Sequence, residues 1–596
     1  MTISGVSSLV RTPPGCIACD RGAVSGRDEA ASGLNRPLPI VDEQNAHFWT
    51  GGADGVLRFN RCHACGAFLH PPVPVCRYCR SEDIGIENVS GRGVVIGATV
   101  NYQQWDPRFP PPFVIATVAI DEDPRVRVIT NVVGVEPETV HVGMRVQVRF
   151  EAVDDVWLPL FEPTGQEPGE GVAELPSDET DPASHGRWVR PRLSTTKFED
   201  RVAISGIGMS PIGRRLMLPP LALTVAAVKA AVADAGLTLD DIDGLSTYPG
   251  GPTEGGFGEG GVSALEDALG LRPTWYNGGA ETFGPAGSVI AAMLAVSAGL
   301  VRHVLCFRTV WQATFAALQR ARDPTGANPY GMGGFGRSRP ARVAGYSAPF
   351  GVGSAANNLA MYASNHFQRY GTTRETLGWI ALNQRANAAL NPTAIYRDPM
   401  SMDDYLSARM ITTPFGLYDC DVPADASVAV IVSAAEGARD LAKPPILVEA
   451  VGTLMTERVA WEQSTMTHEP QVLGPSAHLW SRTTLRPSDV QVAELYDGFS
   501  FNCVSWLEAL GFCGIGEAKD FLHGGRAIAR EGGVVALNTH GGQLSAGRTH
   551  GMGLLHEAIV QLRGEAGERQ VAGARVAVVS SGGLTPAGVV LLRREG

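Results

Sequence analysis

Two closely spaced cysteine pairs constrain the N-terminal part of the chain more than any other feature. The sequence reads Cys62-His-Ala-Cys65 and, ten residues later, Cys76-Arg-Tyr-Cys79. A structural Zn²⁺ ion requires such a closed set of four thiolates, with no coordination position left open. We therefore predict a zinc ribbon over residues 37–80, stabilised by the ion because so short a segment cannot build its own core. Iron in a rubredoxin-like site is the alternative for the same ligands.

Short strands follow the ribbon. Residues 81–165 contain about five apolar segments separated by turns, among them VVIGATVNY and RVQVRFEAV, which predicts a small OB-type β-barrel. Barrels of this kind often bind nucleic acid. This segment has 13 acidic residues against 6 arginines, which argues against a track for phosphates. We expect no nucleic-acid partner.

Length and composition argue against a single-domain, membrane-spanning or secreted protein. A chain of 596 residues is too long for one domain, and its apolar content of 44% describes a globular protein with a large core. No run reaches the ~18 apolar residues of a membrane span. The N-terminus lacks the apolar core of a signal peptide, so we expect a cytoplasmic protein. Residues 1–36 are interpreted as a flexible tail, in which Cys16 and Cys19 provide only two of the ligands that a zinc site needs.

The pattern changes after a linker. Residues 166–200 are first acidic, then basic, and rich in proline. From Arg201 onward, buried strands alternate with long helices, which is typical of layered α/β structure; a helix over Ala222–Ala235 ends at Gly236. A second start of the same character near Pro445 suggests an internal duplication, with halves at 201–440 and 441–596.

Two strand-to-helix loops carry polar side chains. The first follows a strand at Val490–Leu495, with an elbow at Tyr496–Gly498 and then a helix. The second follows a strand at Val534–Asn538 and leads through a glycine-rich loop to a helix from about Met552. Open α/β sheets bind ligands where strands end, so we predict that these loops hold the substrate.

Several landmarks identify a family resemblance. They include GGAETFGPAGSVIAAMLAVSAGLVRHVLCFR (278–308), ELYDGFSFN (494–502) and NTHGGQLSAGRTHG (538–551). With these, residues 201–596 resemble the thiolase superfamily, nearest its sterol-carrier-protein-2-type, lipid-transfer branch. The resemblance implies a five-layered αβαβα sandwich that binds acyl-CoA and is commonly a homodimer. Residues 37–165 resemble the DUF35 family, a zinc ribbon and OB barrel that usually partners thiolase-like enzymes.

The chain departs from thiolases at all four positions of acyl transfer. A thiolase has a nucleophilic cysteine at the start of its first elbow helix, where the helix N-terminus favours thiolate. A second cysteine and two histidines complete the set in that family. The residues at these positions here are Glu281 with Thr282, Ser580, Tyr496, and Gly547-Arg548-Thr549 with His550 slightly later. A covalent acyl-enzyme is therefore not expected.

These changes resemble the lipid-transfer-protein-type aldolases of steroid side-chain degradation, which cleave a β-hydroxyacyl-CoA into a ketone or aldehyde and a shorter acyl-CoA. Such cleavage needs a proton acceptor and donors for the enolate oxygen, but no nucleophile. We expect Tyr496 to be the base or proton relay and His550 its partner. The pKa of a free tyrosine, about 10, is high for a base, and a nearby cation such as an imidazolium would lower it. The other expected site residues are His540 and Asp497 for acid–base work, and Gly541, Gly542, Ser580, Ser581 and Gly582 for the enolate cradle.

Purely structural roles for several of these residues remain open. In the structural alternative, Tyr496 is only a packed elbow residue and Asp497 only a helix cap. Three arginines of a glycine-rich loop either meet CoA phosphates or solvate a lid; they are Arg337, Arg339 and Arg342. Cys306, Cys420, Cys503 and Cys513 are interpreted as core thiols. The alternative functions are an acyltransferase with an unexpected nucleophile and a non-catalytic acyl-CoA-binding or scaffold subunit.

Overall fold

The computed structural model describes residues 36–165, 182–192, 194–249, 254–279, 282, 284–322, 339–458, 463–582 and 587–595. The chain divides into two units, Met1–Asn35 and Arg36–Gly596, and all described residues belong to the second. The predicted tail, with Cys16 and Cys19, lies outside the described residues, as does the first part of the predicted linker. No helix in the described part is long and apolar enough to cross a membrane.

A three-stranded sheet carries the two cysteine pairs, with β1 between β2 and β3. The Sγ atoms of Cys62 and Cys79 lie 3.5 Å apart, those of Cys65 and Cys76 lie 3.6 Å apart, and all four are within 4.8 Å of one another. A tetrahedral ion with Zn–S bonds of ~2.3 Å spaces its sulfurs by about 3.8 Å, so the four thiols fit zinc as predicted. The strands are β1 (Leu57–Cys62), β2 (Phe68–Leu69) and β3 (Ile84–Val89).

Five strands form the predicted barrel. They pair antiparallel in the order β6-β5-β4-β7-β8. A bridge between Val132 and Phe161 returns the last strand to the end of β6. The OB-type prediction is therefore confirmed. The strands are β4 (Arg92–Asn101), β5 (Phe113–Ile120), β6 (Asp123–Thr130), β7 (Arg145–Val153) and β8 (Val156–Pro163).

Elements from the α/β part complete the barrel sheet. Strand β13 pairs antiparallel with β4 through Thr412 and Asn101, and the hydroxyl oxygens of Thr99 and Thr412 lie 2.6 Å apart. Helix α8 packs along β4, where Asn365 Nδ2 donates to the Ile96 carbonyl at 2.6 Å. The barrel and the α/β part thus share a sheet and buried hydrogen bonds. The elements are α8 (Ala355–Tyr370), β13 (Met410–Thr412) and β14 (Phe415–Gly416).

The α/β part is built on one ten-stranded sheet in the order β11-β10-β12-β15-β9-β16-β20-β19-β17-β18. Each half has one parallel pair at its edge, a second parallel pair next to it, and two antiparallel pairs toward the centre. The two halves thus share one strand arrangement, which agrees with the expected internal duplication. The strands are β9 (Val202–Met209), β10 (Gly244–Thr247), β11 (Trp275–Asn277), β12 (His303–Trp311), β15 (Asp425–Ala434), β16 (Ile446–Gly452), β17 (Val492–Glu494), β18 (Ala536–Leu537), β19 (Val576–Ser581) and β20 (Gly588–Arg594).

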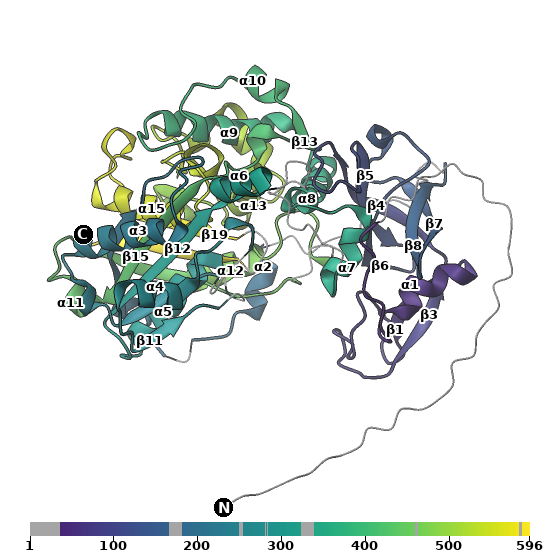
Figure 1. The fold of residues 1–596 in the computed structure, drawn as a ribbon, viewed down its shortest axis with the longest axis horizontal. Coiled ribbons are helices and arrows are strands. Elements are labelled where there is room, and N and C mark those ends of the chain that lie inside the picture. The colour runs from purple at the N-terminus through teal and green to yellow at the C-terminus, as the bar shows by residue number, and fades with distance from the viewer. Residues whose placement is uncertain are drawn as a thin grey trace, which may run out of the picture. The chain divides into compact units, whose positions relative to one another are not determined.

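Helices form the remaining layers. Helices α5 and α15 each contact strands of both sheet halves, so they make the inner layer. Helices α3 and α4 contact the first half, and α12 contacts β16 and β20 of the second; Figure 1 shows α3, α5 and α15 beside these strands. The predicted αβαβα order is confirmed. The helices are α3 (Pro220–Ala235), α4 (Gly261–Leu269), α5 (Gly284–Ser297), α12 (Leu473–Ser481) and α15 (Met552–Arg563).

Predicted and observed elements agree closely around the two loops. Helix α13 follows the elbow, and α15 begins at the expected Met552. The strand predicted at Val534–Asn538 is shorter, because Val534 is 65% exposed and stands before the sheet. Helix α3 ends at Gly236, whose φ of 71° suits glycine. The other helices are α1 (Ala46–Thr50), α2 (Pro182–His185), α6 (Gln312–Arg322), α7 (Val343–Ser347), α9 (Arg374–Ala389), α10 (Met402–Ser407), α11 (Ala435–Ala438), α13 (Ser500–Ala509) and α14 (Ala518–Leu522).

Candidate active site

The two predicted loops meet at one edge of the sheet. Strands β17 and β18 run parallel, with Val492 paired to Ala536, so the elbow and the glycine-rich loop leave the sheet side by side. Two hydrogen bonds of Asn538 connect the elbow to the glycine-rich loop. Its side chain accepts from the Leu495 amide at 2.7 Å and donates to the Leu495 carbonyl at 2.9 Å. The elbow residues and the loop residues are therefore held in one place.

Asp497 binds the glycine-rich loop from inside. Its carboxylate accepts from the Gln543 amide at 2.9 Å, and the side chain is fully buried. A Cβ on Gly542 would lie 1.9 Å from Asp497 Oδ2, so only glycine fits there. Burial raises the pKa of Asp497. The contacts of this side chain give it a positioning task.

His550 stands beside Tyr496, with their ring centroids 6.3 Å apart. Arg308 donates to His550 Nδ1 at 2.8 Å. A guanidinium can only donate, so Nδ1 accepts, and the neutral ring carries its hydrogen on Nε2. Burial, helped by Arg308 and Arg548, holds the pKa of His550 well below its usual value. The ring is therefore a neutral donor at Nε2, so His550 is not the cation that was expected beside Tyr496.

The cation beside Tyr496 is the guanidinium of Arg548. Tyr496 is 3% exposed, and burial raises its pKa above the usual range, although Arg548 opposes this through its charge and a hydrogen bond. The phenol is therefore protonated at neutral pH. Any negative charge that develops on its oxygen has the Arg548 guanidinium beside it.

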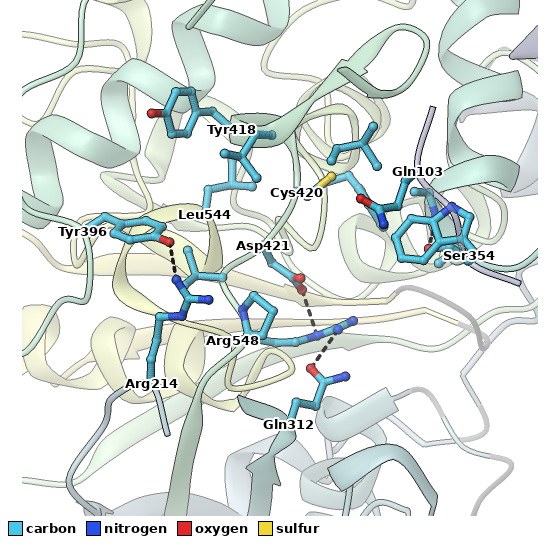
Figure 2. A pocket seen from close by; sticks show the side chains of 18 of the residues that line it. Gln103, Arg214, Gln312, Ser354, Tyr396, Tyr418, Cys420, Asp421, Leu544 and Arg548 are labelled. Atoms are coloured by element: carbon cyan, nitrogen blue, oxygen red, sulfur yellow. Dashed lines mark hydrogen bonds and ion pairs between the residues drawn. The ribbon is translucent and has the colours of Figure 1, made fainter. Parts of the chain in front are cut away.

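Arg548 links Tyr496 to a buried carboxylate. Its Nε forms an ion pair with Asp421 Oδ2 at 2.8 Å, and its terminal nitrogen donates to Gln312 Oε1 at 3.0 Å (Figure 2). Burial raises the pKa of Asp421 to about 6, while Arg548 opposes the rise. Asp421 is thus ionised at neutral pH and close to its titration point.

His540 faces a different direction. Its Nδ1 forms an ion pair with Glu494 Oε2 at 3.2 Å. Burial lowers the pKa of His540, but Glu494, with Glu557 and Asp497, outweighs burial, so the pKa is raised. Among the described residues, no hydrogen bond or ring contact joins His540 to Tyr496. Glu494 therefore favours the protonated form of the His540 ring, and this ring faces Glu494 rather than Tyr496.

A cavity of about 380 Å³ is lined by Arg548, Asp421 and Gln312 of this cluster (Figure 2), whereas Tyr496 and His550 are not among its lining residues. Arg548 lines it and reaches back to Tyr496, and Phe257 lines it with its ring centroid 5.7 Å from that of His550. The volume lies within the ~300–1,000 Å³ of small-molecule sites. Further lining residues are Arg214, Tyr396, Ile411, Leu417, Tyr418, Cys420, Asp421, Phe499 and Leu544.

Three family models match the chain. They are described as the ChsH2 rubredoxin-like zinc ribbon domain (residues 49–85), the ChsH2 C-terminal OB-fold domain (87–151) and the thiolase C-terminal domain-like family (453–593). The order of the three along the chain is ribbon, barrel, thiolase-like part. The expected resemblances to the DUF35 and thiolase families are confirmed.

Whole-length relatives decide the family. The chain is 33% identical to a steroid side-chain-cleaving aldolase of Thermomonospora curvata over 65% of this chain and 97% of that protein. This chain belongs to the thiolase-like aldolases. It is also 32% identical to a 17-hydroxy-3-oxo-4-pregnene-20-carboxyl-CoA lyase of Mycobacterium tuberculosis, over 66% of this chain and 99% of that protein. The solved structure of an Ltp2-ChsH2(DUF35) aldolase matches with a TM-score of 0.57 and 30% identity, covering 66% of this chain and 98% of that one.

Among the described residues of the α/β part, the cysteines of this thiolase-like aldolase do not offer a thiolate nucleophile. Glu281 lies outside the described residues, while Thr282 is half-buried ahead of α5. Cys306 and Cys503 are buried as predicted, but Cys420 lines the cavity and is not a core thiol. Burial, with Asp419 and Asp421 nearby, raises the pKa of Cys420 well above its usual value. A thiol held protonated is a poor nucleophile.

The predicted enolate cradle is only partly free to bind. The Ser580 hydroxyl accepts from the Tyr496 amide at 2.9 Å, and the Ser581 hydroxyl accepts from the Ala286 amide at the start of α5 at 3.3 Å. The Gly541 amide donates to the Asn538 carbonyl at 2.9 Å. Gly582 lies next to the buried Glu469. These contacts bring the former acyl-transfer positions together around Tyr496.

The arginines expected to bind CoA phosphates have other surroundings. Arg337 lies outside the described residues. Arg339 forms ion pairs with Asp154 at 3.0 Å and Asp155 at 2.5 Å, both on the barrel side. Arg342 is exposed, with a positive φ of 53°. Their role in CoA binding stays a prediction.

Sequence reasoning missed the charged residues that surround Tyr496. Arg308 is 2% exposed in β12, and burial lowers its pKa to about 10. A charged residue inside the apolar run VLCFRTVW was a signal that could have found it. Asp421 and Arg214, which donates to the Tyr396 hydroxyl at 2.8 Å, carried no comparable local signal.

Proposed function

We propose that this protein catalyses aldol-type cleavage, or the reverse condensation, of a C–C bond in a β-hydroxyacyl-CoA. The observation that carries the proposal is the pairing of a protonated Tyr496 with the neutral donor His550 and the cation Arg548, beside a cavity. This group moves protons and stabilises an oxyanion. The two curated relatives are named as an aldolase and a lyase of a steroid-derived CoA ester.

The proposed substrate is the CoA thioester of a bulky acyl group, such as a steroid with a short side chain. Support comes from the apolar part of the cavity, which includes Phe257, Leu417 and Leu544, and from the relatives' names. Polar groups at the other end, among them Arg548 and Asp421, suit the oxygen-bearing side chain.

Tyr496 acts in this proposal as a proton relay. The phenol oxygen receives the β-hydroxyl hydrogen while its own hydrogen passes to the enolate that C–C cleavage leaves on the thioester. The relay begins and ends with a neutral phenol, so the raised pKa of Tyr496 is no obstacle. The two transfers are concerted, and Arg548 stabilises the partial negative charge on the phenol oxygen where the transfer to the enolate runs ahead of the transfer from the hydroxyl.

The neighbouring residues divide the remaining work. His550 Nε2–H donates to the thioester oxygen as it becomes an enolate, while Arg308 fixes the ring through Nδ1. Asp497 and His540 position the loop rather than touch the substrate. Backbone amides around Gly542 and Gly582 complete the cradle.

The proposal extends to partners and compartment. We expect two copies to associate through the α/β part, where β11 is an edge strand and Tyr276 is 70% exposed. The described cysteines are all free, which suits the reducing cytoplasm.

The test replaces Tyr496 with phenylalanine. Wild-type protein incubated with a β-hydroxyacyl-CoA should release a ketone or aldehyde and a shorter acyl-CoA, detected by mass spectrometry. Tyr496→Phe should lower kcat by about 100-fold or more with KM nearly unchanged, because the relay is lost and the ring remains. Tyr78→Phe, at an exposed position of the ribbon that does not line the cavity, is the matched control. Full activity of Tyr496→Phe would overturn the site assignment.

A further inference from the structure

The cavity has walls from two parts of the chain. Most of its lining belongs to the α/β part, but Gln103 (Figure 2) and Trp105 belong to the segment that joins β4 to β5 of the barrel. Trp105 is half-buried in this position. A molecule in the cavity therefore touches the barrel as well as the residues near Arg548.

The barrel segment is held firmly at its base. The amides of Tyr102 and Gln103 both donate to the Ile411 carbonyl, at 2.9 and 3.1 Å. Trp105 Nε1 donates to Asn101 Oδ1 at 2.9 Å, and Asn101 Nδ2 donates to the Gln103 carbonyl at 2.6 Å. The indole is thus oriented by its own hydrogen bond, with its ring edge fixed relative to β4.

The α/β part supports the same segment from the other side. Asn357 Nδ2 donates to Asn101 Oδ1 at 3.0 Å, and Arg409 donates to Gln103 Oε1 at 3.0 Å. A Cβ on Gly353 would lie 2.6 Å from the Trp105 Cβ, so the tryptophan packs directly on this glycine. Because the wall cannot retreat, its shape selects among ligands.

We infer that the barrel determines which acyl group the α/β part accepts, and that Trp105 is a specificity-determining residue. The inference rests on the proposed function for the CoA thioester and adds the shape of its acyl group. An indole in the wall, together with the apolar lining residues, suits a flat, fused-ring hydrocarbon. A short straight chain would leave this wall uncovered and would gain little from it.

The experiment compares two substrates in two variants. Trp105→Ala should lower kcat/KM for a fused-ring β-hydroxyacyl-CoA by about 10-fold or more, and for a short straight-chain one by less than about 3-fold. Trp188→Ala removes an indole that is 53% exposed and away from the cavity lining, and should change neither. Trp105→Phe keeps an aromatic ring, so its kcat/KM for the fused-ring substrate should fall less than that of Trp105→Ala. This variant also provides the comparison if Trp105→Ala folds poorly.

A binding measurement separates this inference from the proposed function. The same two thioesters without the β-hydroxyl cannot be cleaved, and titration calorimetry gives their Kd values with wild type and Trp105→Ala. Selective weakening for the fused-ring ligand supports the inference even if wild type cleaves neither substrate, which would overturn only the proposed reaction. Equal loss for both acyl groups, or no loss, overturns the role of Trp105.

Discussion

Replacing Arg548 with methionine tests the electrostatics of the site most directly. The ion pair with Asp421 has an N···O distance of 2.8 Å, with side chains only 18% and 8% exposed. At an effective dielectric constant of about 20, this attraction is about 6 kcal/mol, part of which desolvation cancels. Removing one partner of a buried pair costs about 3–5 kcal/mol, because the other charge stays buried. We expect Arg548→Met to melt at clearly lower temperature than wild type at about pH 8.

The difference in melting temperature between wild type and Arg548→Met should depend on pH. In wild type the pKa of Asp421 is about 6, above that of an exposed aspartate, so its contribution to stability increases as pH falls through about 6. Without Arg548 this pKa rises further, since burial is no longer opposed. The difference in melting temperature should therefore shrink from about pH 8 to about pH 6. Asp421→Asn in the same background should restore stability at the higher pH, and a deficit that is unaffected by pH or by this second change would refute the reasoning.

Three further changes probe other parts of the chain. Cys76→Ser should abolish the binding of one zinc ion per chain and lower the melting temperature, measured by metal analysis and thermal unfolding, because the ribbon is stabilised by its ion. His540→Gln should destabilise the protein by about 3 kcal/mol in denaturant unfolding at about pH 6, because the buried Glu494 loses its cationic partner; since folding raises the pKa of His540, the loss should become smaller as the pH rises through that pKa. Cys420→Ser should keep kcat within about 3-fold and give no acyl-enzyme adduct by mass spectrometry in either form; a loss of 100-fold would favour the acyltransferase alternative.

Local patterns predicted the fold well. The ribbon follows from ligand spacing over residues 62–79, and the barrel follows from alternation within short strands. The pairing of β13 with β4 could not be predicted, because Met410–Thr412 is too short to give a pattern and its partner is about three hundred residues away. Pairing of so distant and short a strand depends on tertiary packing alone.

The residues of the candidate site also divide into those that the sequence could predict and those that it could not. Tyr496 and His550 were found because they occupy positions recognised from the resemblance, and the structure brings them together. Arg308 contacts His550, which is 242 residues away in the sequence. Arg548 contacts Asp421, which is 127 residues away. Such pairs leave no trace in local spacing, so the cation beside Tyr496 could not be assigned from sequence.

The strand that the α/β part lends to the barrel has a consequence for folding. Thr99 and Thr412 are 313 positions apart, so the edge of β4 stays without its neighbour until most of the chain has been synthesised. An uncovered strand edge is a template for pairing with other chains, and contacts of such long sequence separation form late. The barrel produced alone should therefore associate or aggregate through β4, whereas in the whole protein this edge is closed by its own chain.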